Sequence, residues 1–546
     1  MSVARHLLRR AAEAPHQLAV VCPAGRTRAG RATYAHLTYR QLEAESAAVA
    51  SALAAAELMP GTRVAMLVPP SLPFFAVTFG LLRAGLVPVF IDPGMGLKGL
   101  KRCLAEAAPQ AFVGSPKAQL ARALLGWCRG QLTWKLQVGG LAVLGARSLQ
   151  ALAKAATNAA PPPLPASDDP AAVLFTSGST GAPKGALYRH ATFEAQIAAL
   201  GALFGIQPGE VDVCTFPLFA LFAPALGMTA VVPSMDFTEP ARVDPARLFE
   251  VIDDFGATNL FGSPALLRAV ARAGRPRGVT LPSLRRVVSA GAPVSPRIVA
   301  DFVPLLAPGA QLFTPYGATE ALPVACIGSD EILGETGPAA GEGRGICVGR
   351  PAPGIDLALM QVSDGPVPAW SESLRVPQGQ IGEIVVAGPQ VTHAYHHRPE
   401  ADALAKTLGG DGRVRHRMGD LGYLDERGRL WFCGRKAHRL ATPTGELYTD
   451  PCEGVFNAHA RVHRTALVGR GPRGQMTPVL WVEPDAPFPR RDERAQLAGE
   501  LLTLARTRPA TAAIQDIRFL RALPVDRRHN AKIYREKLKA MVDGGG

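Results

Sequence analysis

Apolar and polar positions follow two alternating periods along the chain. Residues 38–53 repeat apolar side chains at helical spacing, and residues 63–68 form a short apolar run of the kind found in strands. A second helical pattern at 74–83 is followed by a second strand pattern at 87–91. Further strand patterns lie at residues 171–175, 258–261 and 286–289. This alternation predicts α/β layers around largely parallel sheets.

The pattern changes from about residue 346. Short apolar runs separated by Gly-rich turns predict a small β-rich subdomain, with strands at 384–387, 421–425 and 430–433. A smaller unit follows Arg435, with strands near 464–468 and 477–482 and a helix at 491–507. We therefore expect an α/β protein. Its large, multi-subdomain N-terminal domain comprises residues 1–435, and a small, mobile α+β C-terminal domain comprises residues 436–546.

Composition narrows the class of protein. A chain of 546 residues is too long for one ordinary core, and 47% hydrophobic with 19% charged residues is typical of a globular protein. The net charge of +14 favours an anionic partner. The basic residues are spread along the chain, without a basic tail or a zinc-finger or RNA-binding signature. A nucleotide substrate accounts for the charge, and no nucleic acid is expected.

Cysteine spacing and apolar segments indicate the compartment. The eight cysteines form no CxxC pair, so neither a zinc site nor a disulfide framework is expected, and the protein is predicted to be cytoplasmic. Residues 1–19 lack the apolar core of a secretory signal. Residues 213–235 carry no formal charge and are long enough to span a bilayer. Their three prolines (Pro217, Pro224 and Pro233) argue against one continuous helix, so we expect a buried core segment or the lining of a hydrophobic site, not a transmembrane segment.

Residues 175–185 read Phe-Thr-Ser-Gly-Ser-Thr-Gly-Ala-Pro-Lys-Gly and follow a predicted strand. Glycines let a backbone approach phosphate closely, and amides, hydroxyls and Lys184 can bind its oxygens. The spacing is neither a Walker A motif nor a GxSxG nucleophile elbow. From composition alone, a flexible surface loop is the alternative interpretation.

Further motifs follow in a fixed order. They are Ser-Ala-Gly-Ala-Pro at 289–293, Tyr-Gly-Ala-Thr-Glu at 316–320, Gly-Glu-Ile-Val-Val-Ala-Gly at 382–388, Met-Gly-Asp-Leu-Gly at 418–422, Gly-Arg at 434–435 and Pro-Val-Asp-Arg-Arg-His-Asn-Ala-Lys-Ile at 524–533. With the loop, this series resembles the adenylate-forming superfamily of acyl- and aryl-CoA ligases, nonribosomal adenylation domains and luciferases. The resemblance runs from about residue 38 to 535.

The resemblance implies ATP and Mg²⁺ and assigns a role to each matching residue. The loop would hold the β- and γ-phosphates through Thr176, Ser177, Thr180 and Lys184, and Gly178, Ser179 and Gly181 would also contact the nucleotide. The nucleotide would further contact Gly291, Ala292, Pro293, Tyr316 and Gly317. Thr319 would bind the α-phosphate, Glu320 the Mg²⁺, Asp420 both ribose hydroxyls, Arg435 the ribose and phosphate, and Lys532 both the carboxylate and the α-phosphate. Without the motifs, Glu320 would be an ordinary helix-start acid, Asp420 a turn residue and Lys532 a solvated charge.

The chain departs from the superfamily where a thiol acceptor is normally handled. The Asp or Lys that usually serves as the hinge corresponds to Ala437. Residues 438–452, where the superfamily usually has a glycine-bearing hairpin and acidic residues, carry two prolines and an altered pattern. Ala220 stands where many relatives have a histidine or an aromatic residue. The adenylation half of the chemistry is therefore intact in sequence, while the thiol-transfer half is altered.

Residues 179–190 and 524–532 closely resemble the OleC-type β-lactone synthetases of bacterial long-chain olefin biosynthesis. This resemblance implies a hydrophobic 2-alkyl-3-hydroxyalkanoic acid that is adenylylated and then closed by its own hydroxyl to a β-lactone, releasing AMP and pyrophosphate. It also implies thiolase, hydrolase and reductase partners, in a multi-enzyme assembly or peripherally at the membrane. One alkyl chain would lie against Phe216, Phe219, Leu221 and Phe222. His190 is a candidate general base for the hydroxyl; a packing histidine is the alternative, and the adenylate phosphate could itself assist.

Two other functions share parts of this sequence. A medium- or long-chain fatty acyl-CoA ligase, or an acyl-AMP ligase that charges a carrier protein, would use the same adenylation residues with an external thiol. A non-catalytic nucleotide-binding scaffold is the second alternative. The presence of Lys184, Glu320, Asp420 and Lys532 argues against the scaffold.

Overall fold

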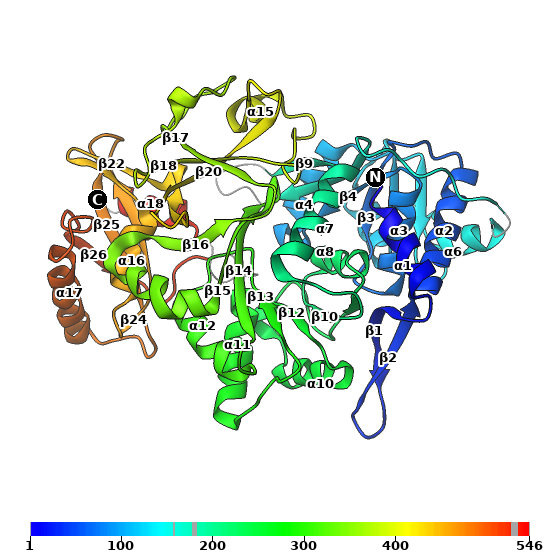
Figure 1. Ribbon diagram of the computed structural model, residues 1–546, viewed down its shortest axis with the longest axis horizontal. Helices are drawn as coiled ribbons and strands as arrows, with labels where there is room; N and C mark the ends of the chain where they lie inside the picture. The colour runs from blue at the N-terminus through cyan, green and yellow to red at the C-terminus, as the bar shows by residue number, and fades with distance from the viewer. Residues whose placement is uncertain (1, 157–158, 177–182, 526–532, 545–546) are drawn as a thin grey trace.

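The computed structural model describes residues 2–156, 159–176, 183–525 and 533–544. Three parts follow one another across the molecule, from the N-terminal sheet on the right of Figure 1 to a small C-terminal unit on the left. The α/β class, with a large N-terminal domain and a small C-terminal one, is confirmed. The boundary between residues 435 and 436 stays a prediction.

The first sheet contains most of the early strand patterns. Its strands are β3 (Arg63–Leu67), β4 (Val87–Ile91), β5 (Ala111–Gly114), β6 (Trp134–Gln137), β7 (Arg147–Ser148), β8 (Pro170–Thr176) and β9 (Lys184–Arg189). Their order is β7-β6-β5-β3-β4-β8-β9, and every pair is parallel except β8 with β9. The predicted strands at 63–68, 87–91 and 171–175 therefore lie in one sheet, as largely parallel layers require.

The second sheet runs through the middle of the molecule. Its strands are β1 (Leu18–Arg26), β2 (Ala32–Thr38), β10 (Val211–Cys214), β11 (Thr229–Val231), β12 (Asn259–Phe261), β13 (Arg286–Val288), β14 (Gln311–Ala318), β15 (Ala321–Gly328), β16 (Ile346–Pro351), β17 (Asp356–Met360), β18 (Gly382–Ala387), β19 (Lys406–Leu408), β20 (Val414–Leu424) and β21 (Leu430–Arg435). The order is β17-β18-β20-β21-β16-β15-β14-β13-β12-β10-β11-β1-β2, with β19 beside β20. Strands β10 to β14 pair in parallel, and β14 turns back into β15. The β-rich subdomain predicted from residue 346 is the antiparallel continuation of this sheet.

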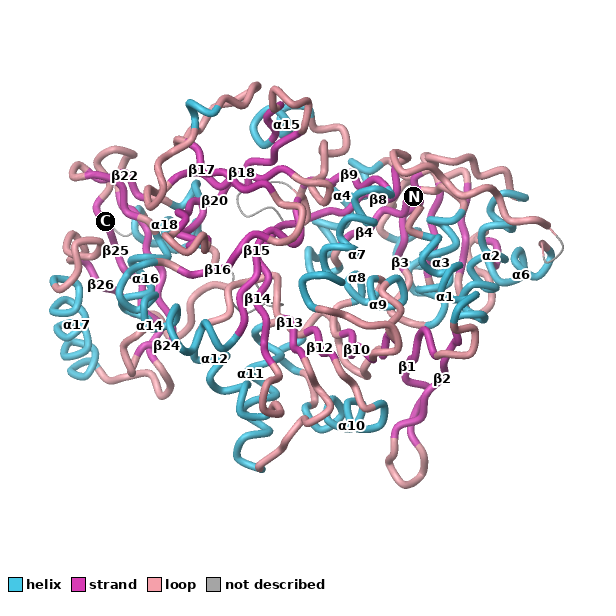
Figure 2. The backbone as a smooth tube through the Cα atoms, in the orientation of Figure 1, coloured by secondary structure: helices cyan, strands magenta, loops and turns pink. Residues whose placement is uncertain are grey.

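Helices cover the sheets and separate consecutive parallel strands, as Figure 2 shows. Those of the large domain are α1 (Ala4–Glu13), α2 (Tyr39–Ala55), α3 (Leu72–Arg83), α4 (Gly96–Ala107), α5 (Pro116–Leu124), α6 (Leu149–Ala155), α7 (His190–Phe204), α8 (Pro217–Ala220), α9 (Phe222–Ala225), α10 (Pro245–Phe255), α11 (Pro264–Gly274), α12 (Pro296–Phe302), α13 (Ser329–Glu331), α14 (Gly337–Ala339) and α15 (Pro399–Ala405). The predicted helices at 38–53 and 74–83 are α2 and α3. Helix α2 begins after Thr38 because its hydroxyl accepts from the Gln41 N–H while the Gln41 side chain accepts from the Thr38 N–H.

The C-terminal residues form a separate sheet with hydrophobic clusters of its own. Its elements are β22 (Leu440–Thr442), β23 (Gly445–Leu447), α16 (Thr449–Asn457), β24 (Val462–Arg470), β25 (Thr477–Pro484), α17 (Arg491–Arg506), β26 (Asp516–Phe519) and α18 (Arg535–Asp543). Strands β24, β25 and β26 form one sheet, and β22 pairs with β23. Leu467, Leu480 and Leu501 lie in one buried cluster of this unit. The predicted strands and helix of the small domain are thus present.

The uncharged segment at residues 213–235 is interrupted, as its prolines indicated. It passes from β10 through the short helices α8 and α9 into β11, and Pro217 is the first residue of α8. Over the part of the chain that the structure describes, no helix is long and apolar enough to cross a membrane.

Candidate active site

A cavity of about 2030 Å³ lies where the two large sheets and the C-terminal unit meet. The carboxyl ends of neighbouring parallel strands open into it: Phe261 ends β12, Ser289 follows β13 and Thr314 belongs to β14. This is the edge at which open α/β sheets bind ligands. Arg535 and Glu453 line the cavity from the C-terminal unit.

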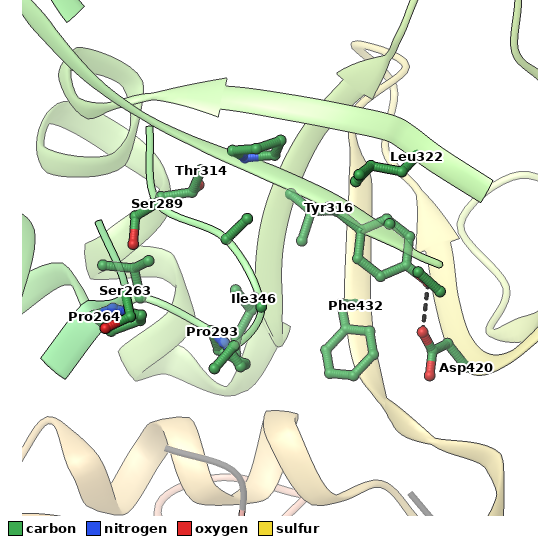
Figure 3. Close-up of a pocket in the computed structure, with 18 of the residues that line it drawn as sticks. Ser263, Pro264, Ser289, Pro293, Thr314, Tyr316, Leu322, Ile346, Asp420 and Phe432 are labelled. Atoms are coloured by element: carbon green, nitrogen blue, oxygen red, sulfur yellow. Dashed lines mark hydrogen bonds between the residues drawn. The ribbon is translucent and has the colours of Figure 1, made fainter. Parts of the chain in front are cut away.

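Asp420 lies at one end of this cavity and is 2% exposed. Its Cα pairs with that of Arg435 across β20 and β21, and Arg435 Nη1 lies 2.8 Å from Asp420 Oδ1. The Tyr316 hydroxyl donates to Oδ2 at 2.6 Å, the dashed line in Figure 3. Burial raises the pKa of Asp420, while Arg435 and Tyr316 lower it. Burial also raises the pKa of Tyr316 well above its usual value, so the phenol stays a donor.

The Asp420 carboxylate retains capacity to accept hydrogen bonds. Oδ1 is buried. It forms an ion pair with Arg435 but accepts no hydrogen bond from any described residue. A carboxylate with one oxygen available and a cation behind it is suited to accept hydroxyl donors, as a ribose would supply. The geometry thus brings three predicted residues, Tyr316, Asp420 and Arg435, into direct contact.

Thr319 and Glu320 form the turn between β14 and β15, so Glu320 is not at a helix start. The Tyr395 hydroxyl donates to Glu320 Oε1 at 2.6 Å, and the Tyr188 hydroxyl donates to the Thr319 carbonyl oxygen. Burial raises the pKa of both tyrosines, so both remain donors. Sequence reasoning assigned neither tyrosine a role. Tyr188 lies within the motif at 179–190, but its contact depends on the placement of the distant turn.

Two lysines flank the ring of Tyr395. Lys184 Nζ lies 5.1 Å and Lys406 Nζ 5.6 Å from the ring centroid, within range for cation–π attraction. Lys406 also donates to the Thr392 carbonyl at 2.5 Å, and Thr392 N–H donates to the Glu320 carbonyl at 2.8 Å. Burial lowers the pKa of Lys406 to about 8, although Glu320 opposes this shift. Lys184 lines the cavity at the predicted phosphate-binding end, whereas Lys406, which no motif indicated, lies behind Tyr395 and outside the lining formed by described residues.

The turn after β13 supplies the predicted adenine contacts. Gly291, Ala292 and Pro293 line the cavity together with Tyr316 and Gly317. Gly291 has φ of +91°, a left-handed conformation that favours glycine. A Cβ at Gly317 would lie 2.7 Å from the Ala321 carbonyl oxygen, so the strand–turn junction also requires glycine. The predicted residues of this group are therefore assembled at one wall.

Another part of the cavity lining is aromatic. All four residues predicted to contact an alkyl chain line the cavity: Phe216, Phe219, Leu221 and Phe222. The ring centroid of Phe219 lies 4.7 Å from that of Phe261, 5.3 Å from that of Phe216 and 6.3 Å from that of Phe222. Phe261, at the end of β12, was not identified from the sequence because its neighbours come from α8, more than forty residues earlier.

His190 is not brought to the cavity. It is the first residue of α7, fully buried, and lies outside the lining that the described residues form. Its Nδ1 is 3.5 Å from the Ser2 hydroxyl oxygen. Burial lowers its pKa to about 4, so the ring is neutral near pH 7. This placement agrees with the interpretation of His190 as a packing residue: the ring lies outside the cavity lining, although Phe193 and Gln196 of the same helix reach the cavity.

Several predicted residues lie outside the described part of the chain. These are Ser177, Gly178, Ser179, Thr180, Gly181 and Lys532. The ends of the loop are placed, because Thr176 on β8 pairs with Lys184 on β9. Ile533, which follows Lys532, pairs with Val525 and lines the cavity. Their assigned roles stay predictions.

The residues present fit a magnesium ion held mainly by phosphate. The described chain contains no group of three or more His, Cys, Asp or Glu side chains that could hold a metal. Mg²⁺ usually binds through one or two carboxylates together with substrate phosphates. Glu320 lines the cavity, and its Oε2 has no hydrogen bond to any described residue. One available carboxylate oxygen beside a cationic phosphate site meets that requirement.

Residues 7–396 match the family of AMP-binding enzymes, and the chain belongs to it. It is thus an AMP-forming ligase, in agreement with the superfamily resemblance of its motifs. The chain is 47% identical to the olefin beta-lactone synthetase of Xanthomonas campestris pv. campestris, over 98% of this chain and 96% of that one. It is also 47% identical to the olefin beta-lactone synthetase of Stenotrophomonas maltophilia, over 98% and 97%. Among solved structures, the amide bond synthetase McbA from Marinactinospora thermotolerans aligns over 98% of this chain and 99% of that one, with 25% identity and a TM-score of 0.78.

Proposed function

We propose that this protein uses ATP to adenylylate a 2-alkyl-3-hydroxyalkanoic acid and then closes the acyl-adenylate to a β-lactone. Identity of 47% over nearly the whole length to two olefin beta-lactone synthetases carries the proposal. The cavity supports it, because a nucleotide-type end with Asp420 and Arg435 and an aromatic end with Phe219 share one space.

In the first step, the substrate carboxylate attacks the α-phosphorus of ATP and pyrophosphate leaves. Two anions must approach, so catalysis is mainly positioning and neutralisation of charge. Asp420 would accept from the ribose hydroxyls, and Lys184 would face the phosphates. Glu320 would hold the Mg²⁺, which supplies positive charge beside the phosphates. Lys532 would bridge the carboxylate and the α-phosphate.

In the second step, the substrate's own hydroxyl oxygen bonds to the carbonyl carbon and the bond from that carbon to the AMP oxygen breaks. The products are the lactone and AMP, and the hydroxyl proton ends in water. A four-membered ring is strained, so closure requires the activated carboxyl that ATP provides. The nucleophile is held in the same molecule, so the site has no need to bind an external thiol.

Polar contacts join the two sides of the proposed domain boundary. Lys436 Nζ donates to Glu383 Oε1 and to the Ser363 carbonyl, both at 2.8 Å. Arg439 lies 2.9 Å and Arg473 2.6 Å from the Asp364 carboxylate. These contacts describe one orientation of the C-terminal unit against the large domain, and the mobility of that unit stays a prediction. Closure by the substrate's own hydroxyl needs no second orientation that would admit a thiol.

The test supplies purified protein with MgATP and a syn- or anti-2-alkyl-3-hydroxy acid, with and without CoA. We expect AMP, pyrophosphate and a lactone, the last identified by its infrared carbonyl band and by NMR, without any need for CoA. A strict requirement for CoA with a thioester as product would contradict the proposal and establish the acyl-CoA ligase alternative. Transfer to an acyl carrier protein in place of CoA would establish the acyl-AMP ligase alternative.

The proposal extends to partners and location. Relatives named for olefin synthesis suggest that thiolase, hydrolase and reductase proteins handle the acid before this enzyme and the lactone after it. We propose a cytoplasmic enzyme that associates with them, or peripherally with the membrane. Co-purification of these three activities with the tagged enzyme from its native cells tests the association.

A further inference from the structure

We propose that the hydroxyl groups of Ser289 and Thr314 bind the 3-hydroxyl group of the substrate and select hydroxy acids. This inference rests on the proposed function and assigns one structural element of the same cavity to one functional group of the acid. It makes Ser289 and Thr314 specificity-determining and positioning residues.

The two hydroxyls are neighbours because of strand register. Strands β12, β13 and β14 are parallel, and Phe261, Val288 and Phe313 are aligned across them. Ser289 follows Val288, and its N–H donates to the Phe313 carbonyl at 2.9 Å. Thr314 follows Phe313, so Ser289 and Thr314 lie side by side at the carboxyl ends of two strands. Both line the cavity, and Figure 3 shows them on the same wall.

The Ser289 hydroxyl is buried and lacks a partner. The residue is 1% exposed, and among the described residues nothing forms a hydrogen bond with its Oγ. Buried polar groups in folded proteins are almost always hydrogen-bonded, so an unpaired hydroxyl at a cavity wall indicates a bond that a ligand completes. Ser263, on the same wall, contrasts with it because its hydroxyl already accepts from the Leu266 N–H in α11.

The position of the pair matches that of a hydroxyl on carbon 3. On one side, Phe261 ends the adjacent strand and contacts Phe219, where an alkyl chain would lie. On the other side, Thr314 and Tyr316 share one face of β14, and Tyr316 bonds to Asp420 at the nucleotide end. In a 3-hydroxy acid, the hydroxyl carbon is two bonds from the carboxyl carbon. The hydroxyl therefore belongs at the junction of the two ends, where Ser289 and Thr314 are.

A serine or threonine hydroxyl both donates and accepts, so the pair can hold the substrate hydroxyl without taking its proton. Holding that oxygen beside the carboxyl carbon orders it for ring closure. A site built to bond a hydroxyl also discriminates against an analogue that lacks it, because its own polar groups then stay unpaired. The pair would thus favour hydroxy acids already at the adenylation step.

The test compares a 2-alkyl-3-hydroxy acid with the 2-alkyl acid of equal length that lacks the hydroxyl. Acid-dependent ATP–pyrophosphate exchange gives kcat/KM for each, and their ratio measures recognition of the hydroxyl. We expect Ser289→Ala to lower this ratio about tenfold, the size of one lost hydrogen bond, with most of the loss confined to the hydroxy acid. Thr314→Val is expected to lower the ratio about threefold.

Thr78→Val is the matched control. Thr78 also lines the cavity, but its hydroxyl donates to the Phe74 carbonyl at 2.7 Å within α3, so the ratio should stay at the wild-type value. An unchanged ratio in Ser289→Ala would overturn the inference. An equal loss for both acids would also overturn it, because Ser289 would then contact a part common to both. The ratio is read before any acceptor is used, so it stays informative even if the wild-type product is a thioester.

Discussion

The proposed nucleotide end and the proposed acyl end of the cavity bury different kinds of side chain. At the nucleotide end, ionisable side chains bind one another: Asp420 contacts Arg435 and Tyr316, and Glu320 contacts Tyr395. At the acyl end, aromatic rings such as Phe219 pack together without charge. Charged groups must be paired when buried, and apolar groups need only shape. Substitutions at the first end should therefore affect catalysis more strongly than those at the second.

The largest effect is expected for Asp420→Asn. The change removes the negative charge that pairs with Arg435 and replaces with an amide the carboxylate that we propose accepts hydrogen bonds from the ribose. Loss of charge-assisted hydrogen bonds at the site should lower kcat/KM for ATP in pyrophosphate exchange by about a hundredfold or more. Steady-state exchange at several ATP concentrations provides the measurement.

Asp425→Asn is the control for this change. Asp425 follows β20 and binds Arg429 at 2.7 Å and the Trp431 indole at 2.9 Å, outside the cavity lining formed by described residues. It should reduce stability while the folded enzyme keeps its exchange kinetics. Equal kinetic losses in the two variants would remove the distinction between a ligand-binding and a structural carboxylate.

The same contrast explains what the sequence could predict. Asp420 and Arg435 were identified because their chemistry requires particular residue types in short motifs, and the register of β20 and β21 then brings them together. Tyr395 was not identified, because its contact with Glu320 depends on how a loop packs against the β14–β15 turn. Phe261 and Ser289 were likewise missed as site residues, since only the alignment of three strands gives them their neighbours.

For the fold as well, elements with a local sequence pattern were predicted, and features that depend on distant contacts were not. The strands at residues 63–67 and 87–91 are short, apolar and bounded by turns, so their pattern is local. The β14–β15 hairpin was not predicted, because the motif at 316–320 was interpreted only as part of a binding site, although it contains Gly317. At residues 213–235 the three prolines predicted an interrupted segment, and the folded chain distinguishes between the two expected locations by placing part of it against a cavity.

A smaller effect is expected at the acyl end for Phe219→Ala. The ring contacts Phe216, Phe222 and Phe261, so its loss enlarges the cavity beside these rings and leaves every charged group paired as before. We expect kcat/KM for long-chain acids to fall about tenfold, or about 1.4 kcal/mol, while short-chain acids change little. A series of acids differing only in chain length, assayed by AMP release, measures the profile.

Phe255→Ala is the matched aromatic control for the acyl end. Phe255 packs on Tyr34 with ring centroids 4.8 Å apart and lies outside the cavity lining formed by described residues. Its loss should destabilise the fold and leave the chain-length profile unchanged. If Phe219→Ala also left the profile unchanged, the alkyl chain would have to bind at another wall.

The smallest effect on catalysis is expected for His190→Gln, because His190 belongs to neither end. Burial places its folded pKa at about 4, below the value of 6.5 for an exposed imidazole. Between these values the unfolded chain binds a proton that the folded protein does not, so stability falls as pH decreases from 6.5 toward 4. Glutamine does not titrate, so the free energies of unfolding from urea titrations at pH 7 and pH 4.5 should differ less in the variant than in the wild type, by about 2 kcal/mol.

The same variant separates the two interpretations of His190. If His190 is the general base for ring closure, its replacement should leave pyrophosphate exchange intact and abolish lactone formation. A packing histidine beside Ser2 predicts lactone formation within about threefold of wild type, together with the weaker dependence of stability on pH. His396, whose pKa burial also lowers to about 4, remains in the variant and preserves part of that dependence. Selective loss of closure would return His190 to the mechanism, although the structure places its ring outside the cavity lining formed by described residues.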